Sequence, residues 1–464
     1  MKHFAGTFLV LLAGWAAAGC ERSTPLSSPP RTPAIEPPAP PVREASPDPA
    51  AVEAAVERIE ALGGSLQRDA KRVVGVQLGD IPASDNDVQL LAGLMEVTHL
   101  ALQGDGITDQ ALDHLADLSQ LTRLTLENTS LTDEGVAKLE RFPRLQYLNL
   151  SNTPALTDAA MAYLARLPEL QYLELRDNNI GNAGLQRLTP VGNLRLLDLR
   201  GCGMVTDAGL VHLAGMTSLR ALRLRSPEIG DRGLASLAGL TNLSELSVEE
   251  ASLLTDEGLQ VLEHFPALTS LRIAHCVGVS DQGFAPLVNL SGLRLLFLRN
   301  TFVTGSLLEY VRGAEHLSRI DLTETMVDDD ALVHLRGMKR LEWLSLANTR
   351  VSDAGMTHLT GLENLTCLRL AETAVGDKGL AEIAQIGRLV ELDLQELRIS
   401  DQGLIQLKSL KNLQRLNIAM VEIGEEAVAQ LQAAIPGLQV LRWPWPGGWP
   451  IRAIDTGTAA DSSL

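Results

Sequence analysis

The chain has 464 residues, of which 45% are hydrophobic, 21% charged and only 3% aromatic, and its formal net charge is −18. The hydrophobic content excludes a disordered chain, and four cysteines in this length exclude a disulfide scaffold. A pI near 5.0 argues against a nucleic-acid binder, which needs a basic surface to displace counterions from phosphates. Length alone predicts about three domains of ordinary size.

The first residues predict an export signal. Lys2 precedes an uncharged run, residues 4–19, which is short for a membrane span and ends in small residues directly before Cys20. We therefore expect residues 1–19 to be a signal peptide. The end of this run, Ala17-Ala18-Gly19-Cys20, resembles the lipobox of bacterial lipoproteins, although that motif usually has Leu where Ala17 stands. The resemblance implies a lipid on Cys20 and a location in the cell envelope, anchored on the extracytoplasmic side of the inner or outer membrane of a bacterium. An ordinary cleaved signal and an uncleaved anchor remain alternatives.

Two segments separate this signal from the body of the chain. Residues 20–50 are rich in Pro, which predicts an extended spacer of up to about 3.1 Å per residue that acts as a tether. Residues 51–72 place Val52, Val56, Ile59 and Leu62 on one helical face before a Gly pair, which predicts an N-terminal cap helix.

Residues 73–443 repeat one unit of 24 or 25 residues about fifteen times, as in residues 341–364, LEWLSLANTRVSDAGMTHLTGLEN. The pattern resembles leucine-rich repeats of the longer type, as in ribonuclease inhibitor and F-box adaptors. The resemblance implies an α/β solenoid, a right-handed superhelix or horseshoe with a parallel β-sheet on its concave face and short helices on its convex face. One long solenoid then replaces the three domains that the length predicts.

Each unit also supports this fold on physical grounds. In LxxLxL, apolar residues alternate with polar ones, as on a strand with one buried face. The following TDxGLxxL has helical spacing, with Thr or Ser as N-cap and Asp in the first turn. Regularly spaced Asp residues would also suit calcium, but capping explains every copy, and we expect no metal site.

A small polar residue follows most strands, where it can bond the backbone of the turn. The residues at this position include Thr129, Thr153, Asn178, Cys202, Cys276, Thr301, Thr325, Thr349 and Thr373. Cys202 and Cys276 are thus structural, and they lie too many strands apart for a disulfide. Cys367 falls on an outward strand position and is the only candidate for a reactive thiol.

No enzyme motif stands out, so we expect neither catalysis nor a cofactor. Four histidines precede the second helical Leu of their repeats and predict a solvated surface column: His114, His212, His334 and His358. Near the C-terminus, three Trp in residues 443–449 favour an apolar cap over a ligand site, so residues 444–464 are predicted to form a C-terminal cap and a disordered tail.

The outward strand positions carry the candidate binding residues, because Arg and aromatic side chains are favoured at protein-binding hot spots. One predicted patch comprises Tyr147, Tyr172, Arg176, Arg200, Arg223 and Arg225, and a second comprises Leu295, Phe297, Arg299, Arg319, Trp343 and Arg369. Lateral stacking of such residues within a sheet is an equally good explanation.

These features predict a non-catalytic recognition protein whose partner is a protein or peptide, with a polysaccharide as another possible ligand. One alternative is an envelope scaffold that uses the convex helices and the rim, where the 25-residue repeats carry their extra turn residue. Another is an F-box-like adaptor repeat domain without its F-box.

Overall fold

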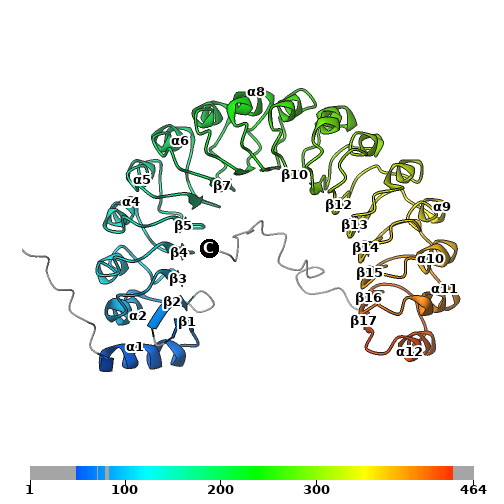
Figure 1. The fold of residues 1–464 in the computed structure, drawn as a ribbon, viewed down its shortest axis with the longest axis horizontal. Helices are drawn as coiled ribbons and strands as arrows, with labels where there is room; N and C mark the ends of the chain where they lie inside the picture. The colour runs from blue at the N-terminus through cyan, green and yellow to red at the C-terminus, as the bar shows by residue number, and fades with distance from the viewer. Residues whose placement is uncertain (1–48, 71, 79–82, 443–464) are drawn as a thin grey trace, which may run out of the picture. The chain divides into compact units, whose positions relative to one another are not determined.

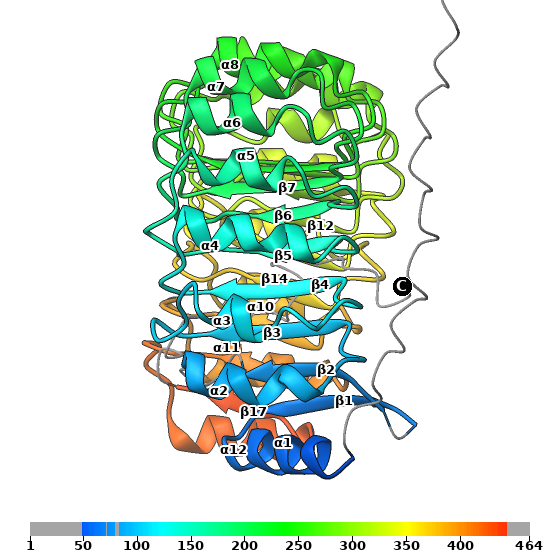
Figure 2. The same ribbon diagram turned by 90° about the vertical axis from the view of Figure 1, so that its left-hand side faces the viewer.

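The structure is a computed structural model that describes residues 49–70, 72–78 and 83–442. Its strands form one sheet in which each strand pairs with the next strand along the chain. Strands line the inner side of the curved repeat unit and helices line its outer side (Figure 1). Turned by 90°, the same unit shows its strands stacked one above another (Figure 2). The predicted signal peptide, the tether up to residue 48, Cys20 and the C-terminal segment from residue 443 lie outside the described residues.

Within the described residues the sheet has 17 strands, and only the first of these is antiparallel to its neighbour. Their bounds are β1 (Ser65–Asp69), β2 (Arg72–Leu78), β3 (His99–Gln103), β4 (Arg123–Glu127), β5 (Tyr147–Asn149), β6 (Tyr172–Glu174), β7 (Leu196–Arg200), β8 (Ala221–Arg225), β9 (Glu245–Glu249), β10 (Ser270–Ala274), β11 (Leu295–Phe297), β12 (Arg319–Asp321), β13 (Trp343–Ser345), β14 (Cys367–Arg369), β15 (Glu391–Asp393), β16 (Arg415–Asn417) and β17 (Gln439–Leu441).

The register of these strands places like residues side by side. Leu124 pairs with Leu148, which in turn pairs with Leu173, and all three side chains are fully buried. Because side chains alternate along a strand, the residues on either side of each core Leu face outward into the concave side. The Leu columns therefore build one continuous core, and the same register sets the neighbours of every residue on the concave face.

The convex segments are short helices, as expected, but many of them are 3₁₀ rather than α. The α-helices are α1 (Pro49–Ala61), α2 (Asp85–Gln89), α3 (Ala111–His114), α4 (Asp133–Ala137), α5 (Ala160–Leu164), α6 (Asn182–Leu188), α7 (Asp207–Leu210), α8 (Asp231–Ala235), α9 (Asp353–Met356), α10 (Asp377–Ile383), α11 (Asp401–Gln406) and α12 (Glu425–Ala434). The 3₁₀ helices are η1 (Leu90–Gly93), η2 (Lys138–Arg141), η3 (Val211–Leu213), η4 (Ser236–Gly239), η5 (Gly258–His264), η6 (Asp281–Asn289), η7 (Ser306–Glu309), η8 (Asp330–Leu335) and η9 (Leu407–Ser409). Between β9 and β13 the convex turns are 3₁₀ only, and in η6 Pro286 lacks the N–H that an α-helix would use there.

The N-terminal cap contains more than the predicted helix. Helix α1 buries Ile59 completely, but it is followed by β1, which pairs antiparallel with β2 and closes the edge of the sheet. Gly64 makes the tight connection possible, because a Cβ there would lie 2.6 Å from Leu78 and 2.8 Å from Ile59. The cap is therefore a helix and a strand that together cover the first repeat.

The repeated Asp does more than begin its own helix. Asp109 accepts hydrogen bonds from the backbone N of Thr132, at 2.8 Å, and from its Oγ1, at 2.6 Å, both in the next repeat. Thr132 meanwhile caps α4 by accepting from the N of Glu134, as expected. The Asp approaches so closely that a Cβ on Gly135 would lie 2.0 Å from its Oδ1. The Gly of TDxG therefore makes room for the carboxylate of the preceding repeat.

The small polar residues after the strands bond the backbone, as predicted. Thr325 Oγ1 donates to Leu322 O at 2.6 Å, and Asn178 Nδ2 donates to the carbonyls of Leu150 and Leu175. Cys202 occupies the same position, and burial raises the pKa of its thiol to about 12. These contacts satisfy the turns from inside the core.

Candidate functional site

The middle of the concave face is occupied by ion pairs that the protein makes with itself. Arg200 on β7 donates to both carboxylate oxygens of Asp198, with Nη2 2.6 Å from Oδ2. Arg223 on β8 lies 3.6 Å from Asp198 Oδ2 and donates from Nε to Glu245 Oε1 at 2.6 Å. Asp198 is fully buried and Arg223 is only 3% exposed. We call these four residues the ion-pair network.

This network corrects one sequence prediction. Arg223 was expected to contact a partner, but it is buried because it neutralises Asp198, which has no access to water. Arg200 is half-buried and its guanidinium is engaged with the same carboxylate. Neither side chain is a free cation on the surface.

The remaining residues of the first predicted patch are also engaged internally. The Tyr147 hydroxyl donates to Glu174 Oε1 at 3.0 Å, and Arg176 pairs with Glu127 at 3.2 Å. Arg225 pairs with Asp177 at 2.7 Å, while Tyr172 lies half-buried beside Tyr147 in register. Burial raises the pKa of Tyr147 well above its usual range, so this hydroxyl stays a neutral donor.

The second predicted patch brings two aromatic rings into contact on the concave face. Phe297 and Trp343 meet edge to face, with ring centroids 6.3 Å apart. Arg272 lies over the Phe297 ring at 4.5 Å and Arg369 over the Trp343 ring at 5.2 Å. Arg319 lies in register between Leu295 and Trp343. We call Phe297, Trp343 and these three arginines the aromatic patch, in which the sequence had not singled out Arg272.

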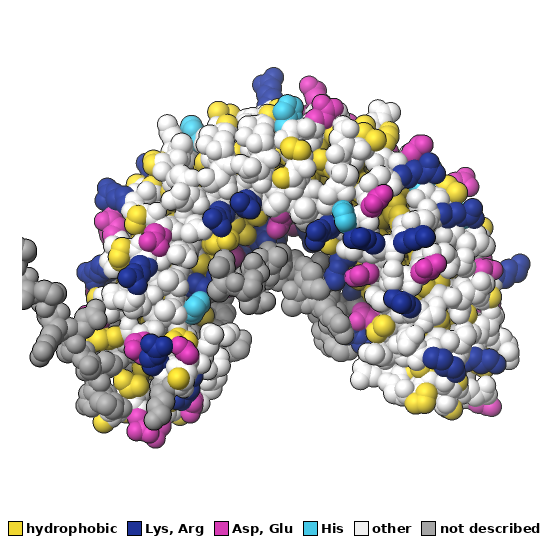
Figure 3. Space-filling view, viewed as in Figure 1, with side chains coloured by type: hydrophobic (Ala, Val, Ile, Leu, Met, Phe, Trp, Pro, Cys, Tyr) yellow, Lys and Arg dark blue, Asp and Glu magenta, His cyan; other side chains and the backbone are white. Residues whose placement is uncertain are grey.

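The charges of the aromatic patch are less fully paired than those of the ion-pair network. Within the described part of the chain Arg319 has no ion-pair partner, and Nε of Arg369 has no hydrogen-bond partner. Arg299, also predicted here, pairs with Glu324 at 2.5 Å and is exposed. Phe297, predicted to contact a partner, is only 6% exposed because Arg272 and Trp343 pack against its ring, so the half-buried Trp343 and the unpaired Arg319 are what the aromatic patch offers to a ligand. Elsewhere the surface mixes acidic and basic side chains (Figure 3).

Cys367, which the sequence offered as a candidate for a reactive thiol, is buried. It occupies an outward strand position on β14, but it is only 5% exposed. Burial raises its pKa to about 11, and its Sγ lies 3.8 Å from Glu391 Oε2. The thiolate is therefore scarce at neutral pH.

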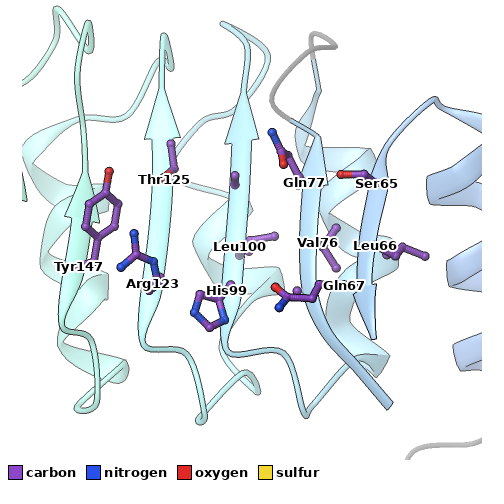
Figure 4. A pocket seen from close by; sticks show the side chains of 12 residues that line it. Ser65, Leu66, Gln67, Val76, Gln77, His99, Leu100, Arg123, Thr125 and Tyr147 are labelled. Atoms are coloured by element: carbon purple, nitrogen blue, oxygen red, sulfur yellow. The ribbon is translucent and has the colours of Figure 1, made fainter. Parts of the chain in front are cut away.

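A polar hollow of about 270 Å³ lies at the N-terminal end of the concave face, over β1 to β5 (Figure 4). It is lined by Ser65, Gln67, Gln77, His99, Arg123, Thr125 and Tyr147, among others. The sequence reasoning missed it, because it depends on Gln67 of the unpredicted strand β1. Ser65–Asp69 gives no alternating pattern that would predict a strand, because Leu66 is its one apolar residue.

A second hollow, of about 400 Å³, lies on the rim beyond the strand ends. Its lining includes Val277, Phe302, Met326 and the charged Arg350. Val277 is 52% exposed and Phe302 54%. Equivalent turns of other repeats expose further apolar residues, Met204 and Leu253. The rim therefore carries an apolar row at the turn position where the 25-residue repeats gain their extra residue.

No group of three or more His, Cys, Asp or Glu side chains in the described part of the chain is placed to hold a metal ion. The helices of the same part are all too short or too polar to cross a membrane. In the histidine column, Nδ1 of both His334 and His358 is buried without a hydrogen-bond partner among these residues, and burial lowers the pKa of His358. This differs from the fully solvated column that was expected.

Comparison with known sequences agrees with the geometry. Models of leucine-rich repeats match residues 119–180, 193–214, 215–238 and 361–384. The protein is a leucine-rich repeat protein. Such proteins commonly mediate protein–protein interactions. No curated protein matches this chain.

Solved leucine-rich repeat structures resemble this one in fold. A chain of the Rad7–Elc1 complex in yeast is 19% identical with a TM-score of 0.53, over 84% of this chain and 92% of that chain. An internalin from Listeria monocytogenes is 18% identical with a TM-score of 0.48, over 85% and 95% of the two chains. The protein LIC12759 from Leptospira interrogans is 18% identical with a TM-score of 0.38, over 78% and 94%. At 19% identity the likeness to the chain of the Rad7–Elc1 complex shows a shared fold and no more.

Proposed function

We propose that this leucine-rich repeat protein is a non-catalytic recognition protein that binds a protein or peptide through the aromatic patch. We further propose that a lipid on Cys20 anchors it outside the cytoplasm of a bacterium, with the Pro-rich tether as a spacer. The observation that carries the binding proposal is the half-buried Trp343 ring, which packs edge to face against the buried Phe297 and lies in register beside the unpaired Arg319. Aromatic and Arg side chains carry most of the energy of protein interfaces.

The chemistry of the aromatic patch suits an apolar side chain next to a carboxylate. Trp343 is half-buried, and Arg369 covers its ring from one side. Because Arg319 lacks an internal acid, a ligand carboxylate would meet a free guanidinium there. In the ion-pair network, by contrast, each guanidinium already has its carboxylate, so we place no contact there.

The test is capture of a partner from cell envelopes by crosslinking and affinity purification of the full chain. We expect Trp343→Ala to weaken capture about thirtyfold or more, as at a hot spot worth about 2 kcal/mol. Arg319→Glu should have a similar effect, and circular dichroism should show both variants folded. Capture that survives both substitutions would contradict the proposal. Release of a Cys20→Ala variant from membranes would support the lipid anchor, and unchanged retention would count against it.

A specific observation favours a second candidate, an envelope scaffold that docks through the rim. Phe302 and Val277 are more than half exposed beside the rim hollow, and large exposed apolar side chains in a row mark docking surfaces. Phe302→Ala is therefore the matched variant. If it abolishes capture while Trp343→Ala does not, the rim is the binding surface and the aromatic patch is not.

A further inference from the structure

The polar hollow over β1 to β5 contains one full charge, that of Arg123. No Asp or Glu lines it, although the whole chain is strongly acidic. Most arginines of the concave face have an acidic partner, as Arg176 and Arg225 do, but within the described residues Arg123 has none. The hollow is therefore electropositive at one point in an acidic protein.

The acids nearest to Arg123 on the concave face are committed elsewhere. Glu127 on the same strand pairs with Arg176 at 3.2 Å. Glu174 accepts the hydroxyl proton of Tyr147 at 3.0 Å. The Arg123 guanidinium instead lies over the Tyr147 ring, with its carbon 4.1 Å from the centroid. Stacking orients the guanidinium plane and leaves its N–H groups for a carboxylate, which they can bind in a forked, charge-assisted geometry.

His99 adds an acceptor to the same hollow. The Thr98 hydroxyl donates to Val74 O at 3.0 Å, so the contact of 2.8 Å between Thr98 Oγ1 and His99 Nδ1 has the imidazole as donor. Nε2 is then the acceptor nitrogen. Burial lowers the pKa of His99, and the charge of Arg123 lowers it further, which keeps the ring neutral. A neutral ring with a free Nε2 accepts a hydrogen bond from a hydroxyl group.

Two amide side chains complete the lining. Gln67 of β1 and Gln77 of β2 border the hollow, and within the described residues neither side chain has a hydrogen-bond partner (Figure 4). Gln67 can lie there because its neighbour is Gly75, where a Cβ would come within 3.0 Å of the Gln67 Cβ. Each amide offers both a donor and an acceptor, as hydroxyl groups require.

We propose that the polar hollow binds a carboxylate that carries neighbouring hydroxyl groups, the chemistry of a uronic acid residue in a polysaccharide. Arg123 holds the carboxylate, while His99, Gln67 and Gln77 hold the hydroxyls. A volume of about 270 Å³ lies just below the range of about 300–1,000 Å³ typical for drug-sized ligands, so the hollow takes a single sugar residue. This site is separate from the aromatic patch and does not depend on its function.

The experiment is ligand-observed saturation-transfer NMR on the full chain, with sodium D-glucuronate, D-glucose, acetate and acetyl-diglycine as probes. We expect glucuronate to bind at least about tenfold more tightly than the other three. Arg123→Gln should weaken glucuronate about tenfold or more, and Gln67→Ala should weaken it several-fold. Arg232→Gln removes an exposed arginine from helix α8, away from the hollow, and is the matched control, which should leave glucuronate binding unchanged.

Any of three outcomes overturns the proposal. If Arg123→Gln leaves glucuronate binding unchanged while its circular dichroism is that of the parent, the hollow is not the site. If acetate binds as tightly as glucuronate, the hydroxyl contacts are wrong, and if acetyl-diglycine binds more tightly, the ligand is a peptide end. Loss of partner capture in Trp343→Ala with glucuronate binding retained would separate the two sites.

Discussion

The close fit between the repeated Asp and the repeated Gly predicts that a Gly→Ala substitution lowers the free energy of unfolding when the Asp is present and raises it when the Asp is removed. Asp377 accepts from the backbone N of Ser400 at 2.8 Å and from its Oγ at 2.6 Å. A Cβ on Gly403 in α11 would lie 1.9 Å from Asp377 Oδ1 but 3.2 Å from its Cβ. Gly403→Ala should therefore expel the Asp377 carboxylate, whereas the same substitution in an Asp377→Ala background meets only a methyl group.

The expected magnitudes follow from those contacts. Two charge-assisted hydrogen bonds to the exposed Ser400 are worth about 2 kcal/mol together once water competes for them. Ala in place of Gly inside a helix gains about 1 kcal/mol. Gly403→Ala should thus lower the free energy of unfolding by about 1 kcal/mol in the parent. In the Asp377→Ala background it should raise that free energy by about 1 kcal/mol, a coupling of about 2 kcal/mol.

The assay is urea denaturation followed by circular dichroism, with hydrogen exchange at the Ser400 amide as a local readout. Repeat proteins can unfold in stages, so the urea transition of the whole chain need not report on one repeat. In that case the hydrogen-exchange rate of the Ser400 amide measures the local change in stability. Gly387→Ala is the control, because a Cβ there meets nothing within 4 Å. Equal destabilisation by Gly403→Ala in both backgrounds would refute the account of why this Gly is repeated.

Three further outcomes are expected. Arg223→Ala should cost about 2–3 kcal/mol of stability because it removes a buried guanidinium from between Asp198 and Glu245 and leaves the buried Asp198 with Arg200 alone, while Arg319→Ala should cost less than about 0.5 kcal/mol, both by urea denaturation; a similar small cost for both would contradict the buried network. With a pKa of about 11, Cys367 should resist alkylation at pH 8 in the native protein and react after unfolding, as peptide mass mapping can check; rapid native labelling would disprove its burial. Burial raises the pKa of Asp393, so the ionised carboxylate destabilises the folded protein above the folded-state pKa, and this cost is absent below the unfolded-state pKa. Asp393→Asn should therefore raise the free energy of unfolding at pH 7, and this gain should disappear as the pH falls toward about 4. A gain that grows as the pH falls would contradict the sign of the pKa shift.

Much of the fold was predictable because the same hydrophobic periodicity is visible in the sequence of each repeat. The alternation around Leu124 and Leu148 predicts a buried face, and the structure places both in adjacent strands in register. The helical spacing after each TD pair correctly predicts a helical segment on the convex side. It does not predict the kind of helix, since several of these segments are 3₁₀. The strand β1 was missed because its polar residues pair antiparallel with β2 and carry little apolar signal.

The candidate site was predictable only as a set of positions. Register makes Arg319 and Trp343 neighbours, and this could be read from the repeat spacing. The repeat spacing does not show which arginines lack an ion-pair partner. Arg223, for example, is buried because it pairs with Asp198 in the preceding repeat and with Glu245 in the following one. The burial of Cys367 likewise depends on side chains of neighbouring strands rather than on its own position.

The sequence by itself determined the repeat, the parallel order of the strands and the face on which each side chain lies, because periodicity and register are local properties repeated along the chain. The tertiary structure alone decided which charges remain available. Side chains from repeats 24 or more residues apart come into contact on the concave face, as Arg123 and the Tyr147 ring do, and a linear pattern does not say which partner each will take. The same closeness between repeats explains why an Asp in one unit requires a Gly in the next.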